Sequence, residues 1–573
     1  MNQQHSSHTE SISPDLGNDA QGRVNPIYFG IVTLAINVLS LGLPILAMQV
    51  YDRIIARGGI STLYVLTIGV AIAILLETIL RIGRSYLTAW SGALREHALR
   101  TQAVAHCLST DIRHLQRIGT SRLMQYMDSI AKLREFYSGQ AIIAFIDIPF
   151  ICIFLGMIAY LGGILAIIPA VLVTVFIART WMSGRALMQR IVTHEKIEAH
   201  RYQSIFEMLN GIHTIKAYAA ENRMLRRYEH IQEHSAATSH AITRSAGDAY
   251  NDGALFSQLM SALVLIAGAY LSLQGTLSMG ALVACMLLSG RIMMPLQRVL
   301  SLWVQYQDLK LARARMEELF ALPCATQAAT NAIITSSALS LSNIKFTHTG
   351  CSESLLRDIT LDIAPGATIA IHGDSGSGKS TLLKLIAGIY TPDSGSIRIG
   401  NVDTQLLSPA QRAGQVGYLA TKGTIFQGSL DNNISGYSSC DAHAVNTIAH
   451  LLGIDQEIAR LPNGYETMLE NTPADSVPPG LKQRITLARV LAFKPRIILF
   501  DNADRALDKE GYNHIFRLLA RIKGKATLIL VSEDHNVLHL ADRHYVLRDG
   551  QLEVTFDHGS GAQEVTGYQE LRL

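Results

Sequence analysis

The 573-residue chain is 49% hydrophobic and only 17% charged, which is too apolar for an ordinary soluble enzyme and typical of a membrane protein with a soluble part. Its formal net charge of +3 predicts no nucleic-acid partner. The six cysteines are scattered without a CxxC pair or metal-ligand spacing, so we expect reduced structural thiols.

Residues 1–25 are polar and lack the apolar core of a signal peptide, which predicts a disordered cytosolic tail. A transmembrane domain is predicted over 26–318, because six apolar runs there each approach the roughly 20 residues that a spanning helix needs. Helices of a soluble bundle are the alternative, but they would show a polar stripe. The runs are 26–50, 63–82, 141–160, 162–182, 254–274 and 279–304.

Basic residues predict the orientation of these spans. The connections between spans three and four and between spans five and six are very short and carry no Lys or Arg. The segments after spans two and four are long, basic and helical in pattern, so we expect spans that extend far into the cytosol, with both termini cytosolic. The first long segment carries Arg84, Arg95, Arg100, Arg113, Arg117, Arg122, Lys132 and Arg134.

The composition changes after the sixth span. Residues 319–335 are predicted to be a linker, and 336–573 an α/β domain in which strands alternate with helices. Strands are expected at 367–372, 496–500 and 526–532, with a helix at 379–389.

Residues 373–380 read GDSGSGKS, a complete phosphate-binding loop between a predicted strand and a predicted helix. Its glycines let backbone N–H groups surround phosphates, and the helix N-terminus adds a positive field. Lys379 is expected to reach the β- and γ-phosphates, Ser380 to ligate Mg²⁺ and Thr381 to contact the α-phosphate; a chance Gly/Ser-rich turn is the alternative. The predicted ATP-binding residues are Gly373, Asp374, Ser375, Gly376, Ser377, Gly378, Lys379, Ser380 and Thr381.

Six spans followed by this domain resemble an ABC half-transporter of the exporter type, and more closely the permease/ATPase component of type I secretion systems. The resemblance runs from about residue 27 to the end of the chain. Some members of this family carry an N-terminal peptidase-like domain; because the tail is short, we expect none here. Family-like stretches in the membrane part are Met48–Arg53, Phe145–Phe150, Thr214–Glu221 and Leu288–Leu296.

The signature sequence of the family, Leu-Ser-Gly-Gly-Gln, corresponds here to Val477–Leu481, which reads VPPGL. In the family this sequence contacts ATP held by the phosphate loop of a second subunit. The serine hydroxyl is absent, the two prolines offer no N–H group, and only Gly480 keeps the expected type.

The hydrolytic position also departs from the family. Asp501 keeps the carboxylate that, with Ser380, is expected to position Mg²⁺. The next position, normally the glutamate that activates water, is Asn502. An amide cannot accept a proton at neutral pH, and loss of a positioned base reduces a rate by about 10²–10⁴-fold.

Three further positions are aligned with family residues. Glu533 occupies the place of the switch histidine, where a carboxylate would repel the γ-phosphate, and His535 is expected to point elsewhere. Thr421 replaces the γ-phosphate-sensing glutamine. His348 replaces the aromatic residue that stacks on adenine, a mild change because imidazole can stack. Residues 505–508, RALD, keep most of the loop that couples the two sites, and Gln483, Arg484, Asp542 and Arg543 anchor the alignment.

Charged residues also fall within the predicted spans. Asp147 and Arg291 are expected either to lie on a substrate pathway or to form a structural pair. Glu77 with Arg81 and Arg84 is interpreted as a set of neighbours on one helix near the cytosolic boundary. Met293 and Met294 are interpreted as packing residues rather than as a surface that binds a peptide substrate.

The leading hypothesis is an ATP-binding subunit with degenerate hydrolysis motifs. It would pair with a complete ABC half-transporter and export a polypeptide across a bacterial inner membrane. The nucleotide-binding domains would lie in the cytosol, and a periplasmic adaptor would be a further partner. One alternative is a non-transporting regulatory subunit that binds ATP. The other is a slow homodimeric exporter of lipids or small amphiphiles, still an ATP-driven translocase.

Overall fold

The computed structural model describes residues 26–138, 140–324, 334, 336–437, 440–469 and 477–557. The predicted tail and residues 325–333 and 335 of the predicted linker lie outside these ranges. The chain forms two compact units. One contains the chain up to Thr110 with Ile118–Pro323, and the other contains Asp111–Arg117 with the chain from Cys324 onward.

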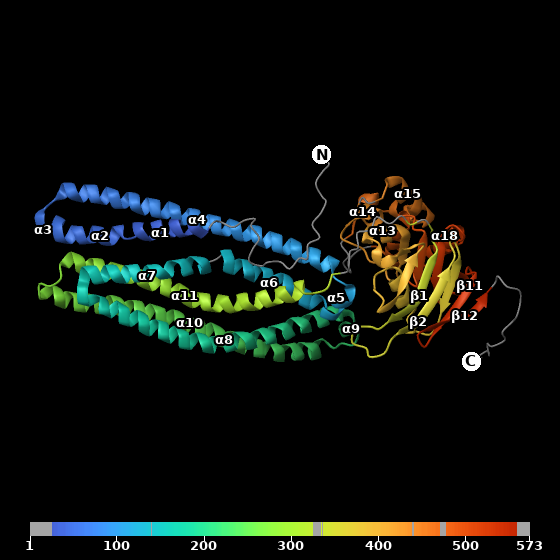
Figure 1. Ribbon diagram of the computed structural model, residues 1–573, viewed down its shortest axis with the longest axis horizontal. Helices are drawn as coiled ribbons and strands as arrows, with labels where there is room; N and C mark the ends of the chain where they lie inside the picture. Colours follow the sequence, from blue (N-terminus) through green and yellow to red (C-terminus); the bar gives the residue numbers. More distant parts are fainter. Residues whose placement is uncertain are drawn as a thin grey trace. The chain divides into compact units, whose positions relative to one another are not determined.

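The first unit is built from long helices (Figure 1). Each predicted span lies on one or two of them, in the order α1 with α2, α4, α7, α8, α10 and α11. The elements are α1 (Pro26–Leu39), α2 (Gly42–Gln49), the π-helical turn η1 (Val50–Ile54), α3 (Ile55–Arg57), α4 (Ile60–Ser109), α6 (Thr120–Ser138), α7 (Gln140–Gly162), the 3₁₀ turn η2 (Gly163–Ala166), α8 (Ile167–Asn210), α9 (Ile212–Ala217), α10 (Glu221–Leu273) and α11 (Met279–Phe320).

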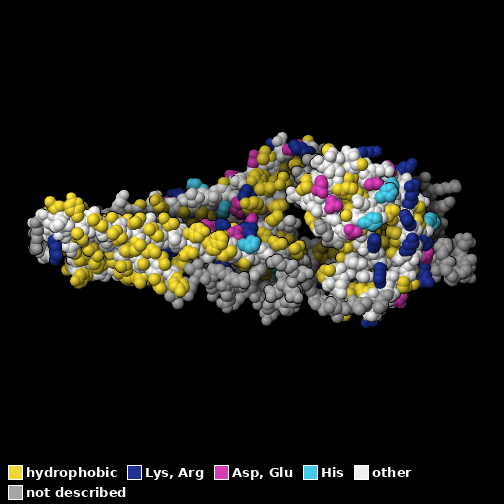
Figure 2. All heavy atoms as spheres, turned by 90° about the horizontal axis from the view of Figure 1, so that it is seen from above, with side chains coloured by type: hydrophobic (Ala, Val, Ile, Leu, Met, Phe, Trp, Pro, Cys, Tyr) yellow, Lys and Arg dark blue, Asp and Glu magenta, His cyan; other side chains and the backbone are white. Residues whose placement is uncertain are grey.

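Five helical stretches in the described ranges are long and apolar enough to cross a membrane. Four of them each cover all or most of one predicted span. The stretch Asp147–Asn210 covers most or all of two predicted spans, because only the turn η2 separates α7 from α8. Large apolar side chains such as Val65 and Ile266 are exposed on these helices, and Figure 2 shows apolar side chains gathered over this part of the bundle. An apolar surface of this kind suits lipid rather than water.

The long basic segments that were predicted to be cytosolic are helical, as expected. Helix α10 has 53 residues, so at 1.5 Å per residue it is about 80 Å long, well beyond the roughly 30 Å hydrocarbon core of a bilayer. Helix α4, with 50 residues, likewise extends past the membrane.

The second unit has the predicted α/β architecture. Its elements are α5 (Ile112–Ile118), β1 (Leu339–Phe346), β2 (Leu356–Ile363), β3 (Thr368–His372), α12 (Lys379–Ile386), β4 (Ser394–Ile399), β5 (Val402–Asp403), η3 (Thr404–Leu406), α13 (Pro409–Gln415), β6 (Val416–Leu419), β7 (Gly428–Ser429), α14 (Leu430–Ser435), α15 (Ala442–Leu451), α16 (Ile454–Ile458), η4 (Gly464–Glu466), β8 (Met468–Leu469), α17 (Pro479–Ala492), β9 (Ile497–Asp501), α18 (Lys509–Ile522), β10 (Thr527–Val531), α19 (His535–Leu538), β11 (Arg543–Arg548) and β12 (Gln551–Asp557).

A six-stranded sheet organises this unit, in the order β12-β11-β3-β10-β9-β6. All neighbours from β11 to β6 are parallel, with Val531 of β10 opposite Asp501 of β9. These central strands are buried along their length, as expected for a parallel sheet covered on both faces. An antiparallel sheet, β2-β1-β4-β5, and a short β7-β8 pair complete the unit.

Helix α12 ends earlier than predicted. The sequence predicted a helix over 379–389, but α12 ends at Ile386. Gly388 adopts a left-handed conformation with φ of 67°, and the Ile389 N–H donates to the Lys384 carbonyl oxygen at 2.9 Å. This hydrogen bond is the Schellman arrangement, which closes a helix at a glycine.

Helix α5, except for its last residue, belongs to the second unit, although it lies in a long segment that was predicted to belong to the membrane domain. Arg113 donates from Nη2 to Thr391 Oγ1 at 2.6 Å, and its Nη1 lies 3.3 Å from Asp393 Oδ1. The Tyr390 hydroxyl donates to Gln116 Oε1 at 3.3 Å. Arg113 therefore attaches α5 to the rest of the second unit, in addition to being one of the basic residues that predict the orientation of the spans.

Candidate functional site

A cavity of about 680 Å³ lies at the carboxyl ends of the parallel strands. Because β3, β6, β9 and β10 run in the same direction, the loops that follow them converge at one edge of the sheet, where ligands bind in open α/β folds. The cavity is lined by His348, Leu355, Ile371, His372, Gly373, Ser375, Gly376, Gly378, Lys379, Ser380, Thr381, Thr421, Asn502, Arg505, Ser532, Glu533, His535 and Leu538.

The phosphate loop forms one wall of this cavity, between β3 and α12. A Cβ atom at Gly373 would lie 2.5 Å from the Leu547 carbonyl oxygen, so the close approach of these two backbone segments requires glycine there. The Lys379 ammonium donates to the carbonyl oxygens of Gly373 at 2.5 Å and Asp374 at 2.8 Å. Burial lowers the pKa of Lys379, although the carboxylates of Asp374, Glu533 and Asp501 oppose this shift.

Ser380 and Asp501 meet, as the sequence predicted. Ser380 Oγ donates to Asp501 Oδ1 at 2.7 Å, and the Tyr418 hydroxyl donates to Asp501 Oδ2 at 2.7 Å. Burial raises the pKa of Tyr418, and the Asp501 carboxylate raises it further, so the phenol stays protonated. A hydroxyl beside a buried carboxylate offers the oxygen ligands that Mg²⁺ prefers, so this pair fits the ion.

Thr421 has a structural role in this arrangement. Its Oγ1 donates to the backbone carbonyl oxygen of Asp501 at 2.8 Å and joins the end of β6 to the end of β9. A threonine side chain is shorter than the glutamine of the family, and its hydroxyl is already engaged.

His348 lies on the cavity wall beside the phosphate loop. Its Nε2 is 3.3 Å from Thr381 Oγ1, and its ring lies edge-on to Phe346 with the ring centroids 5.0 Å apart. Stacking of this imidazole on adenine stays a prediction.

Asn502, which the sequence aligned with the catalytic glutamate of the family, has an unusual backbone conformation. Its φ is 47°, in the left-handed region that asparagine tolerates better than most residues, and its N–H donates to the Val531 carbonyl oxygen at 2.8 Å. Its buried Oδ1 accepts no hydrogen bond from the described part of the chain. The amide oxygen can accept a hydrogen bond from water but cannot remove a proton from it.

Glu533 forms an ion pair with Arg505, which the sequence did not predict. Arg505 lowers the pKa of Glu533, and Glu533 raises that of Arg505. The prediction that His535 points elsewhere is wrong, since His535 lines the same cavity. No individual role was predicted for Arg505, and none for Tyr418, which lies on β6 beside β9, the strand that carries Asp501.

The segment Val477–Leu481, which the sequence aligned with the family signature, lies at the start of α17. Pro478 caps this helix and Pro479 is its first residue, a position where proline is favoured because its fixed φ suits the helix. A helix N-terminus otherwise presents free N–H groups to anions, and these two positions present none. Val477 and Leu481 are buried in the core of the unit, so neither side chain replaces the missing polar groups.

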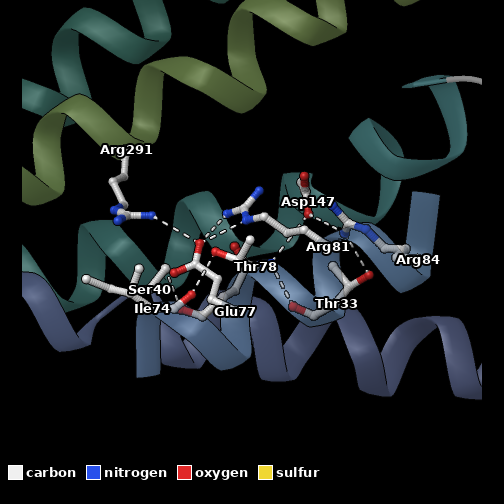
Figure 3. Close-up of polar contacts among 10 residues, drawn as sticks. Thr33, Ser40, Ile74, Glu77, Thr78, Arg81, Arg84, Asp147 and Arg291 are labelled. Carbon is white, nitrogen blue, oxygen red and sulfur yellow. Dashed lines mark hydrogen bonds and ion pairs between the residues drawn. The ribbon is translucent and has the colours of Figure 1, made fainter. Parts of the chain in front are cut away.

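A separate charged network lies within the helical unit (Figure 3). Arg84 of α4 is 6% exposed; its Nη1 lies 3.9 Å from Asp147 Oδ1 of α7 and donates to Thr33 Oγ1 at 3.1 Å. Asn37 of α1 donates from Nδ2 to Asp147 Oδ1 at 3.4 Å. This half of the network joins α1, α4 and α7.

The other half of the network joins α4 to α11. Arg81 Nη2 lies 2.6 Å from Glu77 Oε1, and Arg291 Nη1 lies 4.0 Å from the same oxygen. Asp147 and Arg291 therefore each pair with α4 rather than with each other. The interpretation of Glu77, Arg81 and Arg84 as neighbours on one helix is incomplete, because two of the three also pair with other helices.

We expect Arg84→Ala to destabilise the membrane domain by about 3–5 kcal/mol, because it removes a buried cation that lies 3.9 Å from the buried Asp147 carboxylate. Thermal unfolding of the purified protein in detergent measures this loss. Arg100→Ala is the matched control on the same helix, since its exposed pair with Glu96 is expected to contribute only about 0.3–0.5 kcal/mol. Equal effects of the two substitutions would contradict the assignment of Arg84 as a buried structural cation.

Comparisons with known proteins agree with this architecture. Residues 27–296 match the ABC transporter transmembrane region, and residues 356–505 match the ABC transporter family. The chain is 28% identical to the leukotoxin export ATP-binding protein LtxB of Aggregatibacter actinomycetemcomitans, over 91% of this chain and 74% of that protein. It is 26% identical to the alpha-hemolysin translocation ATP-binding protein HlyB of Escherichia coli O157:H7, over 92% and 75%.

A solved structure shares the fold. It is a bacterial Atm1-family ABC exporter with ATP bound, with a TM-score of 0.79, 21% identity and coverage of 93% of this chain and 95% of the other.

Proposed function

Because this chain is an ABC exporter with its transmembrane and nucleotide-binding domains on one polypeptide, we propose that it binds Mg-ATP but hydrolyses it poorly without a partner. It is a multi-pass protein of the bacterial inner membrane, with the nucleotide-binding domain in the cytosol. The observation that carries the proposal is a complete phosphate loop facing Asn502 and Glu533 across one cavity.

The binding half of the proposal depends on groups that are already in place. Lys379 would hold the β- and γ-phosphates, and the loop and the N-terminus of α12 would supply backbone N–H groups. Ser380 and Asp501 would hold Mg²⁺, which neutralises phosphate charge when bound. The Tyr418 hydroxyl fixes the Asp501 carboxylate in the orientation that Ser380 meets.

The weakness in hydrolysis follows from four replaced groups. Asn502 can hold a water but cannot deprotonate it. Thr421 is engaged with the backbone of Asp501, and Glu533 places a carboxylate where the family places a histidine. The signature helix begins with two prolines and so lacks both the hydroxyl and the N–H donors that would contact a second subunit's ATP.

A heterodimer with a complete ABC half-transporter explains this combination better than a homodimer. In a homodimer both sites would contain Asn502, Glu533 and the Pro-Pro signature. A complete partner would contribute its own glutamate and an intact signature. Since the named relatives export or translocate leukotoxin and alpha-hemolysin, we propose a polypeptide cargo, with a periplasmic adaptor as a further partner.

A slow homodimeric exporter is the second candidate, and one observation favours it. Asn502 lines the cavity and its Oδ1 accepts no hydrogen bond from the described part of the chain, so this oxygen would be available to orient a nucleophilic water even without a base. A non-transporting regulatory subunit is the third candidate, and it would bind ATP without moving cargo.

Reconstitution with a catalytically complete ABC half-transporter tests the proposal. We expect cargo export and ATP turnover only when both subunits are present, and loss of both when the catalytic glutamate of the partner is replaced by glutamine. Lys379→Ala in this chain should impair export while leaving the partner's fold intact. Export by this chain alone would favour the homodimer, and ATP-dependent control without cargo movement would favour the regulator.

A further inference from the structure

The ion pair between Arg505 and Glu533 carries an inference that rests on the proposed nucleotide binding. We propose that Arg505 recognises the terminal phosphate of a nucleoside triphosphate by exchanging its Glu533 partner for that phosphate. The pair would make this cavity discriminate between a triphosphate and a diphosphate.

Arg505 and Glu533 both line the cavity that contains the phosphate loop. Arg505 lies in the turn after β9 and Glu533 in the turn after β10, and these strands are adjacent and parallel, with Asp501 opposite Val531. Both side chains line the cavity that contains Lys379. Any phosphate held by Lys379 therefore lies in the same enclosure as the pair.

Hydrogen bonds hold the backbone around the pair, whereas the two side chains are exposed to solvent. Ser532 Oγ donates to Asp504 Oδ2 at 2.7 Å and accepts from the Asp534 N–H at 3.0 Å, which ties the two turns together. The Arg505 N–H donates to the Asn502 carbonyl oxygen at 3.3 Å. The side chains of Arg505 and Glu533 are 53% and 73% exposed, so they can change partners without opening the core.

The exchange is favoured by charge and geometry. A guanidinium forms the same bidentate hydrogen bonds with a carboxylate or with phosphate oxygens. A terminal phosphate carries more negative charge than one carboxylate, so it is the stronger partner when it is within reach. A diphosphate lacks that group, and Arg505 would stay with Glu533.

The charge state of the pair is stable near neutral pH. Arg505 holds the pKa of Glu533 below its ordinary value, with Lys379 acting in the same direction, and Glu533 raises the pKa of Arg505. Both groups stay ionised between pH 6 and 9. The preference for triphosphate should therefore be flat over this range, unlike that of a site gated by a histidine with a pKa of about 6.5.

Nucleotide affinities of the full-length chain in detergent test the proposal, with a non-hydrolysable ATP analogue and ADP, each with Mg²⁺. Arg505→Ala should weaken triphosphate binding by about tenfold or more and change ADP binding less than about twofold. Glu533→Gln should strengthen triphosphate binding, because it removes both a competitor and a repulsive charge. The double variant should bind the triphosphate more tightly than Arg505→Ala alone.

Arg505→Lys and Arg521→Ala serve as controls. Lysine keeps the charge but not the bidentate geometry, so an intermediate loss is expected. Arg521 is exposed on α18 and lies outside the cavity lining, so its replacement should have no effect. Equal losses for the triphosphate and ADP, or an unchanged triphosphate affinity in Arg505→Ala, would overturn this inference alone. A native chain that binds no nucleotide would overturn the proposed function as well.

Discussion

Replacing Lys379 with alanine is expected to weaken Mg-ATP binding by about 10- to 100-fold, the loss expected when a charge-assisted hydrogen bond to phosphate is removed. The ammonium of Lys379 lies in the phosphate loop, and no other lysine lines the cavity in the described part of the chain. Equilibrium binding of a fluorescent ATP analogue to the purified full-length chain measures the change.

Lys525→Ala is the matched control for this prediction. Lys525 is exposed in the turn between α18 and β10, away from the residues that line the cavity. Its replacement should leave ATP affinity unchanged. If Lys379→Ala and Lys525→Ala bind ATP as tightly as the native chain, the phosphate loop is not the nucleotide site.

Restoring hydrolysis is expected to require several substitutions together. Asn502→Glu alone supplies a base but leaves Glu533 beside the phosphate and the Pro-Pro start of α17 unchanged, so turnover should stay near the native level. A variant that combines Asn502→Glu with Glu533→His, Thr421→Gln, Pro478→Ser and Pro479→Gly should raise turnover by about 10²–10⁴-fold, the contribution of a positioned base once the other groups allow it to act. Release of inorganic phosphate by purified protein measures both variants.

The combined variant leaves Leu481 unchanged, because this side chain is 3% exposed in the core and a polar replacement there would destabilise the domain. Adding Lys379→Ala to the combined variant should abolish the regained turnover, which separates it from a contaminating ATPase. Full recovery from Asn502→Glu alone would show that the interpretation of Glu533 and of the prolines is wrong.

Much of the architecture could be predicted because local patterns determine it. The six apolar runs lie on the helices that form the bundle, since length and hydropathy suffice to identify a spanning segment. The strands around the phosphate loop and Asp501 are within one residue of their predicted ends, because buried parallel strands are continuous apolar runs. The meeting of Ser380 with Asp501 follows from the converging ends of these strands.

The contacts between distant segments could not be predicted in the same way. Helical periodicity places Arg84 on one face of α4, but it does not say that Asp147 of α7 lies against that face. The pairing of Arg505 with Glu533 likewise depends on β9 and β10 being neighbours, an order that the sequence alone does not give. Alignment with the family pattern identifies Glu533 only as a replaced histidine, whereas the structure shows that Arg505 is its partner.

The most direct test of the account measures nucleotide binding and phosphate release by the same preparation of the purified chain, without any partner. The account predicts saturable Mg-ATP binding that Lys379→Ala weakens, together with phosphate release no faster than that of the Lys379→Ala variant. Steady ATP turnover by the unaccompanied native chain on the order of 1 s⁻¹ or faster, as in an ordinary enzyme, would contradict it.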